Sequence, residues 1–211
     1  MSDFFVFKIF LAHYLACFNK FKNTIIMKRI IYLLALISTS AFAQEQQKDV
    51  VTVSANYNFS EPTQYGLSME FAKDTKLDER HSSWILNVGY GQLELDENNL
   101  KTTGQGFVVE LGTRNYFKKG VRQGFYGENF ITHGQIKFDE TINGQNFEGK
   151  YSYWSIINPN VGYKIQLTKN LSLDPSVGFN WKWEVKGKGD IDNQYFDNFV
   201  FKAGVKLGYT F

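Results

Sequence analysis

The sequence contains little cysteine and little proline, and it lacks a series of long apolar runs. One cysteine and 3 prolines in 211 residues exclude a small disulfide-stapled domain and a proline-rich or collagen-like chain. A mean hydropathy of −0.31 excludes a protein with several apolar transmembrane helices. Aromatic residues, in contrast, make up 17% of the chain. A membrane β-barrel remains possible, because its strands are apolar on only one face.

One apolar run near the N-terminus has the three parts of a secretory signal peptide. Basic residues 27–29 (MKR) precede the apolar residues 30–40 (IIYLLALISTS) and an A-x-A cleavage site. We therefore predict a signal peptide over residues 27–43 and a mature start near Gln44. Residues 1–26 are then an N-terminal extension from a gene start placed too far upstream. The alternative, a lipoprotein anchored at Cys17, would leave a complete signal peptide downstream of the anchor.

Removal of the first 43 residues changes the charge and the cysteine count. These residues hold five of the 23 basic residues and one of the 21 acidic ones, so the remaining 168 residues carry a net charge of −2 instead of +2. No basic stripe remains to indicate nucleic-acid binding. Cys17 is removed as well, which excludes thiol catalysis and thiolate metal sites. We treat residues 44–211 as one domain.

Apolar and polar residues alternate with a period of two from Val51 onward, which is typical of β-strands. The two most regular runs exceed the ~5–6 residues of an ordinary strand and fit tilted transmembrane strands. The predicted strands are residues 51–59, 65–73, 84–95, 106–117, 125–138, 157–167, 171–185 and 199–211. The phase of the strand from Phe125 to Phe138 stays open. The pattern predicts an all-β fold, an eight-stranded antiparallel up-and-down transmembrane β-barrel.

The connections between the strands give the barrel a direction. With the N-terminus in the periplasm, the outer loops are Ser60–Gln64, Asp96–Gly104, Asp139–Tyr153 and Lys186–Asn198. The periplasmic turns are Asp74–Ser82, Lys118–Gly124 and Thr168–Asn170. Outer loops of such barrels are usually longer than their periplasmic turns, and the sequence follows this rule except in the first pair.

The alternation alone does not show which face meets lipid, because a lipocalin is also an eight-stranded barrel but has its apolar residues inside. Glycine in the polar phase suits the narrow interior of a membrane barrel; the glycines are Gly66, Gly112, Gly162, Gly178, Gly204 and Gly208. Aromatic residues near the strand ends suit interfacial girdles. The predicted girdles are Trp181, Trp183, Phe199 and Phe201 toward the outside and Phe117, Tyr163, Tyr209 and Phe211 toward the periplasm.

The signal peptide, the eight strands and the terminal pattern VKLGYTF (residues 205–211) resemble small outer-membrane proteins of the OmpA-transmembrane-domain, OmpX and OmpW type. In that group the terminal aromatic residue and its alternating neighbours are recognised by the outer-membrane assembly machinery. The resemblance implies this role for Val205, Leu207, Tyr209 and Phe211.

A second resemblance lies in the middle of the chain. The segment ELGTRNYF (residues 110–117), a short turn and then GFY (residues 124–126) are similar to small outer-membrane β-barrel proteins of Bacteroidetes-like bacteria. Pro159 and Pro175 depart from the pattern, because each removes a hydrogen-bond donor from a predicted strand. We expect them to mark bulges or strand ends.

Charged residues in the polar phase predict a salt-bridge network in the barrel lumen, because unpaired buried charges would each cost several kcal/mol. Its predicted members are Glu70, Glu110, Arg114, Lys164, Asp174, Lys182, Glu184, Lys202 and Lys206. The network indicates a sealed, polar-lined barrel. A narrow, gated conduit is the alternative, and an open porin is excluded, because an aqueous channel needs about 16 strands.

Other candidate sites are sparse. His81-Ser82-Ser83 is similar to the His-x-Ser of outer-membrane lipid A deacylases, but it falls in a periplasmic turn, and we predict a solvated turn. Asp190, Asp192, Asn193 and Asp197 lack the spacing of a calcium loop, so no metal and no cofactor are predicted.

Basic and aromatic residues near the outer rim are candidates for surface contacts. Lys186 and Lys188 would lie where they could meet lipopolysaccharide phosphates, or they form a solvated basic loop. The aromatic residues of the third and fourth outer loops form either a binding surface or part of the outer girdle. They are Tyr151, Tyr153, Trp154, Tyr195 and Phe196.

The function expected from the sequence is that of a non-enzymatic, monomeric, integral protein of the Gram-negative outer membrane. Its sealed barrel would have a structural or surface-binding role through the outer loops. The expected partners are outer-membrane lipids, lipopolysaccharide and the assembly machinery, with no nucleic acid. The alternatives are a narrow, OmpW-like channel for small or apolar solutes and a lipid-modifying enzyme.

Overall fold

The computed structural model describes residues 49–73, 82–97, 100–117, 123–142, 145–191 and 195–211. The segment predicted to precede the true gene start (residues 1–26), the signal peptide (residues 27–43) and Gln44 lie outside the described residues. The chain divides into two compact units. One consists of Met1–Asp49 and Lys73–Thr75, and the other of Val50–Ala72 and Lys76–Phe211. The described strands of the second unit form a β-barrel.

The described residues form nine β-strands. They are β1 (Asp49–Phe59), β2 (Thr63–Lys73), β3 (Ser82–Glu97), β4 (Leu100–Tyr116), β5 (Gly124–Ile142), β6 (Gln145–Ile157), β7 (Pro159–Gln166), β8 (Leu171–Gly189) and β9 (Phe199–Thr210). No helix among the described residues is long and apolar enough to cross a membrane.

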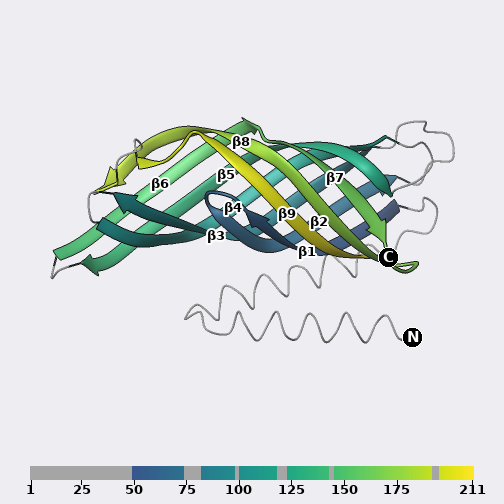
Figure 1. Ribbon diagram of the computed structural model, residues 1–211, viewed down its shortest axis with the longest axis horizontal. Helices are drawn as coiled ribbons and strands as arrows, with labels where there is room; N and C mark the ends of the chain where they lie inside the picture. Colours follow the sequence, from purple (N-terminus) through teal and green to yellow (C-terminus); the bar gives the residue numbers. More distant parts are fainter. Residues whose placement is uncertain (1–48, 74–81, 98–99, 118–122, 143–144, 192–194) are drawn as a thin grey trace. The chain divides into compact units, whose positions relative to one another are not determined.

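The strands form one closed sheet. Neighbouring strands pair around the ring from β1 through β5, and β9 closes it by pairing antiparallel with both β1 and β8. Strands β6 and β7 follow one another along one position of the ring, because each pairs with both β5 and β8. The ring therefore has eight positions, which confirms the predicted eight-stranded antiparallel barrel. Figure 1 shows the tilted strands wrapping around the barrel.

The break between β6 and β7 lies at Asn158, directly before Pro159. The Asn158 backbone N–H donates to the Asn129 side chain (3.1 Å), and its carbonyl accepts from the Phe130 N–H (3.3 Å). Pro159 thus begins a strand, one of the two outcomes expected for it. Pro175 lies inside β8, opposite Val205 on β9, and ends no strand.

One end of the barrel follows the expected pattern of a membrane-spanning wall. Outward-facing side chains of its strands are large, apolar and exposed, including Trp84, Val88, Leu111, Val177 and Phe201. Inward-facing residues alternate with them and are buried and mostly polar, such as Asn56 and Ser68. We call this part of the wall the belt: β1, β2, β7, β9 and residues 82–91, 106–116, 124–134, 154–157 and 171–183.

At the other end, β3 to β6 and β8 continue beyond the belt. We call this part the extension: residues 92–97, 100–105, 135–142, 145–153 and 184–189. Figure 1 shows β5 and β6 projecting furthest at its left end. The second and third predicted loops, Asp96–Gly104 and Asp139–Tyr153, were therefore wrong in large part, because most of their residues continue the strands as hairpins.

The extension reverses the polarity of the belt. Most of its outward side chains, such as Glu94 and Asp96, are polar, although the exposed Val185 is apolar. Its inward side chains form a buried apolar cluster with Ile191 and Phe196, which follow β8; the cluster consists of Leu93, Leu95, Ile136, Phe138, Tyr151, Tyr153, Ile191 and Phe196. Burial of such side chains is the main stabilising contribution in a water-soluble core.

Three of the aromatic residues expected in outer surface loops belong to this cluster. Tyr151, Tyr153 and Phe196 are buried, so they cannot form an exposed binding surface or a lipid-facing girdle. Only Trp154 and Tyr195 of that group are exposed. The prediction failed because the strands continue and turn these rings inward.

Glycines on the inner wall accommodate large rings from neighbouring strands. A Cβ added at Gly134 on β5 would collide with the ring of Tyr153 on β6, and one added at Gly162 on β7 would collide with the ring of Tyr126 on β5. The narrow interior is thus filled by aromatic rings lying against glycine backbone, which agrees with an eight-stranded barrel just wide enough to be filled by side chains.

Candidate functional site

Arg114 on β4 is the centre of a charge cluster inside the belt. Its Nη2 lies 2.9 Å from Glu128 Oε2, and its Nη1 lies 3.3 Å from Glu70 Oε2 and 3.1 Å from Asp174 Oδ2. These carboxylates come from β5, β2 and β8, so the guanidinium joins four strands. The guanidinium carbon also lies 3.7 Å from the centre of the Tyr126 ring. All five donors of an arginine side chain are available for such convergent binding.

Glu70 has a full set of donors around its carboxylate. Lys164 Nζ donates to its Oε2 at 3.0 Å, while the Ser83 and Tyr116 hydroxyls donate to its Oε1 at 2.6 and 2.9 Å. With Arg114, four side chains therefore satisfy one buried acid. A carboxylate paired and hydrogen-bonded in this way can be retained in a buried site.

A second group of polar residues surrounds Glu110 on β4. Lys202 Nζ donates to Glu110 Oε1 at 2.7 Å, and the Asn87 side chain donates to its Oε2 at 2.8 Å. The amide of Asn158, at the break between β6 and β7, donates to Glu110 Oε1 at 3.0 Å and to the Thr132 hydroxyl at 2.8 Å. The interruption of the strand thus turns a side-chain amide toward a buried acid.

The two groups are joined and their charges balance. Lys206 Nζ lies 3.3 Å from Glu128 Oε1, and Lys202 and Lys206 both lie over the ring of Phe130, at 5.3 and 5.4 Å. Among the described residues the interior ion pairs involve four acids and four bases: Glu70, Glu110, Glu128 and Asp174 with Arg114, Lys164, Lys202 and Lys206. We call these eight residues the charge layer.

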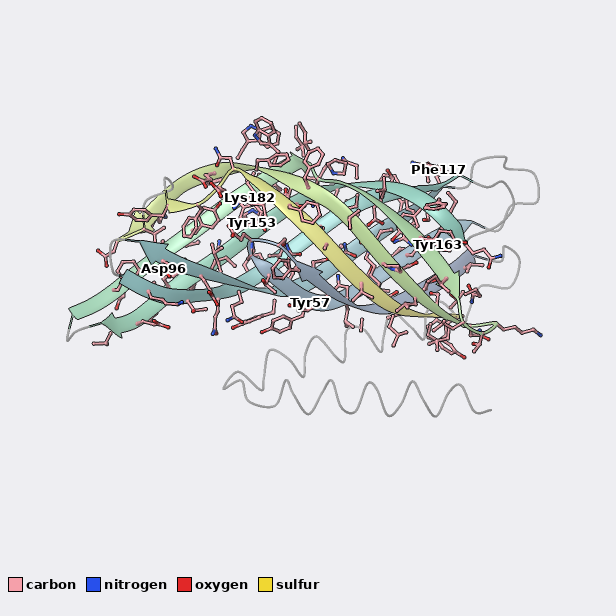
Figure 2. All side chains as sticks on the ribbon, viewed as in Figure 1. Tyr57, Asp96, Phe117, Tyr153, Tyr163 and Lys182 are labelled. Atoms are coloured by element: carbon pink, nitrogen blue, oxygen red, sulfur yellow. The ribbon has the colours of Figure 1, made fainter. Side chains whose placement is uncertain are left out.

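Two of the residues expected in this network lie apart from it. Glu184 accepts a hydrogen bond from the Tyr151 hydroxyl at 2.9 Å. Lys182 is fully buried, its Nζ has no hydrogen-bond partner among the described residues, and it lies over the rings of Tyr151 and Tyr153 at 5.4 and 5.7 Å. Figure 2 shows Lys182 and Tyr153 close to one another and distant from Phe117 and Tyr163.

Glu128 is the member of the charge layer that sequence reasoning missed. It lies on β5, the strand whose phase could not be fixed. Apolar residues occupy both faces of that strand: Phe125 and Ile131 are exposed, while Tyr126 and Phe130 are buried. Arg114 is opposite Glu128 in the strand register. The need of a buried arginine for an acidic partner on β5 could therefore have identified Glu128.

The residues that were considered as catalytic or metal candidates, and at which no site was predicted, lie only partly among the described residues. His81 lies outside the described residues. Ser83 does not lie in a solvated turn but on β3, where its hydroxyl is buried and donates to Glu70. Asp192 and Asn193 also lie outside the described residues, and Asp190 accepts from the Glu148 backbone N–H at 3.0 Å. Within the described ranges, no three His, Cys, Asp or Glu residues are grouped to hold a metal ion.

The terminal pattern lies on the outward face of β9. Val205, Leu207 and Tyr209 alternate with the buried Lys206 and with Gly208, and the Tyr209 and Phe211 rings lie 5.0 Å apart. Phe211 is exposed, and its backbone N–H donates to the Val51 carbonyl at 3.0 Å. The four residues therefore lie on the outward side of the last strand and its end, and this strand closes the ring by pairing with β1.

The fold is similar to solved outer-membrane barrels, although no protein-family model and no curated protein matches the sequence. A major outer-membrane protein from Thermus thermophilus has a TM-score of 0.59 and 14% identity, with 77% of this chain and 99% of that chain covered. The N-terminal β-barrel domain of Pseudomonas aeruginosa OprF has a TM-score of 0.49 and 17% identity, with 79% of this chain and 100% of that domain covered. The chain has the fold of the small outer-membrane β-barrels, as the resemblance to OmpA, OmpX and OmpW predicted.

Proposed function

We propose that the chain is an integral outer-membrane protein with a sealed, non-enzymatic barrel whose extension forms a structural or binding platform outside the membrane. The fold supports an outer-membrane location, and the exposed apolar side chains of the belt match a hydrocarbon environment. The extension then faces the aqueous side, because its outward residues are polar.

The observation that carries the sealed barrel is the filling of the lumen by two successive layers. The charge layer crosses the belt from wall to wall through Arg114, which contacts carboxylates from three other strands. The apolar cluster fills the extension with side chains that are less than a tenth exposed. An ion would have to break buried ion pairs and then cross an apolar region, and hydrophobic constrictions oppose ion passage.

Planar-bilayer recording of the purified, folded protein tests this proposal. We expect no reproducible conductance from the native protein, and none from Arg114→Ala or Tyr153→Ala, because each variant alters one layer and leaves the other intact. A boiled aliquot of the same sample controls for detergent artefacts. Regular conductance steps from the native protein, absent from the boiled sample, would overturn the sealed barrel.

A narrow conduit is the second candidate, and buried polar atoms without a partner favour it. Several such atoms line the wall among the described residues: Asn56 Oδ1, Asn58 Nδ2, Ser172 Oγ, Asn180 Oδ1 and Lys182 Nζ. Buried polar atoms are usually satisfied, often by water. The same recording decides between the candidates, and swelling of protein-containing liposomes in small uncharged solutes extends it to neutral cargo.

The location and the assembly signal need tests of their own. We expect the protein in the outer-membrane fraction, with a mature N-terminus near Gln44 and with gel migration that changes on boiling. Deletion of Phe211 should reduce the amount of folded protein in that fraction, whereas Leu167→Ala, which removes another exposed apolar side chain, should not. Normal amounts of the Phe211 deletion would contradict an assembly role for the terminal pattern.

A further inference from the structure

The outward surface of β4, β5, β6 and β8 is arranged in cross-strand rows. One row at the end of the belt contains Val109, His133, Trp154 and Trp183, which are neighbours in register. The His133 and Trp154 rings stack with centroids 4.3 Å apart, and both tryptophans are exposed. Aromatic residues with polar ring atoms are typical of the boundary between hydrocarbon and headgroups. The two tryptophans therefore indicate that the membrane boundary lies near this part of β6 and β8.

Four residues farther along β6, three lysines from adjacent strands form another row. Lys137 on β5 is paired in register with Lys150 on β6, which is paired with Lys188 on β8. Lys137 and Lys188 are exposed and Lys150 is half-buried. Their neighbour in the same row on β4 is the uncharged Gln105. We call Lys137, Lys150 and Lys188 the lysine row.

The lysine row places three positive charges side by side with no direct ion pair, although Asp139 and Glu148 lie two residues farther along the same face. Cβ atoms of directly opposed residues lie about 4.5–5.5 Å apart, and like charges in such positions are destabilising. None of the three lysines forms an ion pair with another described residue, unlike Lys101, which pairs with Asp96 at 3.7 Å. The repulsion between the three amines would be offset by an anion that contacts several of them at once.

The rows on either side indicate the direction from which an anion would approach. Between the lysine row and the aromatic row lie uncharged residues: Phe107, Gln135, Ser152 and Val185. On the far side, Asp139 and Glu148 are opposed in register and carry negative charge. The acids repel an anion on that side, so the membrane side is the accessible approach.

The height of the lysine row above the aromatic row matches lipid headgroups. From Trp154 to Lys150 the chain advances by four residues, which is about 13 Å along a strand and about 10 Å along the normal of a membrane for a strand tilted by ~35–45°. Lysine side chains can also bend toward the interface while their stems cover apolar surface. The amines can therefore reach groups that lie directly above the hydrocarbon boundary.

We propose that the lysine row binds the phosphate groups of lipopolysaccharide in the outer leaflet. This inference rests on the proposed function, because it requires the extension to lie outside the membrane. The chemistry is charge-assisted hydrogen bonding between three ammonium groups and a phosphorylated glycolipid held beside the barrel wall. Lys188 was a candidate for this contact from the sequence, whereas Lys137 and Lys150 join it only through the strand register. The Lys186 side chain lies outside the described residues.

Binding of phosphorylated lipid A to the purified full-length protein in detergent, followed by native mass spectrometry, tests the proposal. Near an anionic surface each lysine contributes about a fivefold change in affinity, so the triple variant K137Q/K150Q/K188Q should bind roughly a hundredfold more weakly. The matched control is K101Q, which removes an exposed lysine from the same extension. It should bind like the native protein. The shift in gel migration on boiling shows whether each variant is folded.

Three results would overturn the inference: native-like binding by the triple variant, equal binding of dephosphorylated lipid A, or equal binding of phosphatidylglycerol. The last result would mean diffuse attraction to negative charge and no site for the glycolipid phosphates. Cell fractionation separates this failure from failure of the proposed function. Outer-membrane protein whose triple variant binds normally disproves only the lysine row, whereas protein absent from that fraction disproves the proposed location itself.

Discussion

Five strands of the belt, β3 to β6 and β8, continue into the extension, yet the faces of the two regions have opposite polarity. On β3, Val88 faces outward and Asn87 inward within the belt. A few residues later, Glu94 faces outward and Leu95 inward within the extension. The alternation of period two continues through both regions, and only the assignment of apolar residues to a face changes.

The difference shows that the surrounding solvent decides which face of an alternating strand is apolar. In lipid, apolar side chains on the outer wall match the surrounding hydrocarbon. The polar groups then lie in the interior, where charged side chains are stabilised by pairing. In water, apolar side chains are stabilised inside, and polar ones remain on the surface. A single wall that passes from one solvent to the other must therefore exchange its two faces.

The largest effect is expected from the centre of the charge layer. Arg114→Leu leaves Glu70, Glu128 and Asp174 without their shared cation, and loss of one member of a buried ion-pair network lowers the free energy of unfolding by about 3–5 kcal/mol. Denaturant titration followed by tryptophan fluorescence measures the change.

The matched control for Arg114 is Lys169→Leu, which removes an exposed cation from the turn between β7 and β8. It should change the free energy of unfolding by less than about 0.5 kcal/mol. Equal effects of the two substitutions would show that the charge layer does not stabilise the belt.

The apolar cluster of the extension should respond as a soluble core does. Phe138→Ala removes a buried ring that lies 6.0 Å from the Phe196 ring and should lower the free energy of unfolding by about 3–5 kcal/mol. Hydrogen exchange should locate the loss of protection in the extension and leave the belt protected. A loss spread evenly over both regions would contradict two separately packed interiors.

A pair of identical substitutions on one face of β4 compares the two environments directly. Leu111→Arg places a charge in the belt and should cost about 2–4 kcal/mol, whereas Thr103→Arg, on the outward face of the extension, should change stability by less than about 0.5 kcal/mol. Denaturant titration in lipid vesicles gives both values. Similar costs at the two positions would mean that both face the same medium.

The smallest effect is expected from the exposed ion pair of Lys101 and Asp96. Both side chains are more than 70% exposed, and such pairs contribute between about 0 and 1 kcal/mol. A double-mutant cycle with Lys101→Ala and Asp96→Ala measures the coupling. A coupling energy above about 2 kcal/mol would show that this part of the extension is shielded from water.

The period-two pattern was sufficient to predict the barrel, its eight positions and most residues of the charge layer. It could not place the ends of the strands, because residues such as Thr102 and Thr103 are polar in both phases. Leu93 and Leu95 fell inside a predicted strand, in the phase that is mostly polar within the belt. Their inward burial depends on the rings of Phe138 and Tyr151, which approach only after folding. The predicted loops therefore began where polar residues fill both phases and not where the strands end.

The pairing of individual charges was also beyond the sequence pattern. Lys182 belongs to the polar phase of β8 as Asp174 does, but it lies eight residues farther along, beside Tyr151 and Tyr153. Glu128 escaped notice because the interior accepts rings such as Phe130 as well as charges. Phase alone defines a face, whereas partners depend on height along the barrel and on the register between strands.

The reversal of polarity is tested most directly by spin labels on the outward face of β3. Labels attached singly to cysteines replacing Leu86, Val88, Gln92 and Glu94, in a Cys17→Ser background, report whether each site collides with lipid-soluble oxygen or with a water-soluble nickel complex. For protein in lipid vesicles, we predict oxygen contact at positions 86 and 88 and nickel contact at positions 92 and 94. The same accessibility at all four positions would contradict a wall that passes from lipid into water.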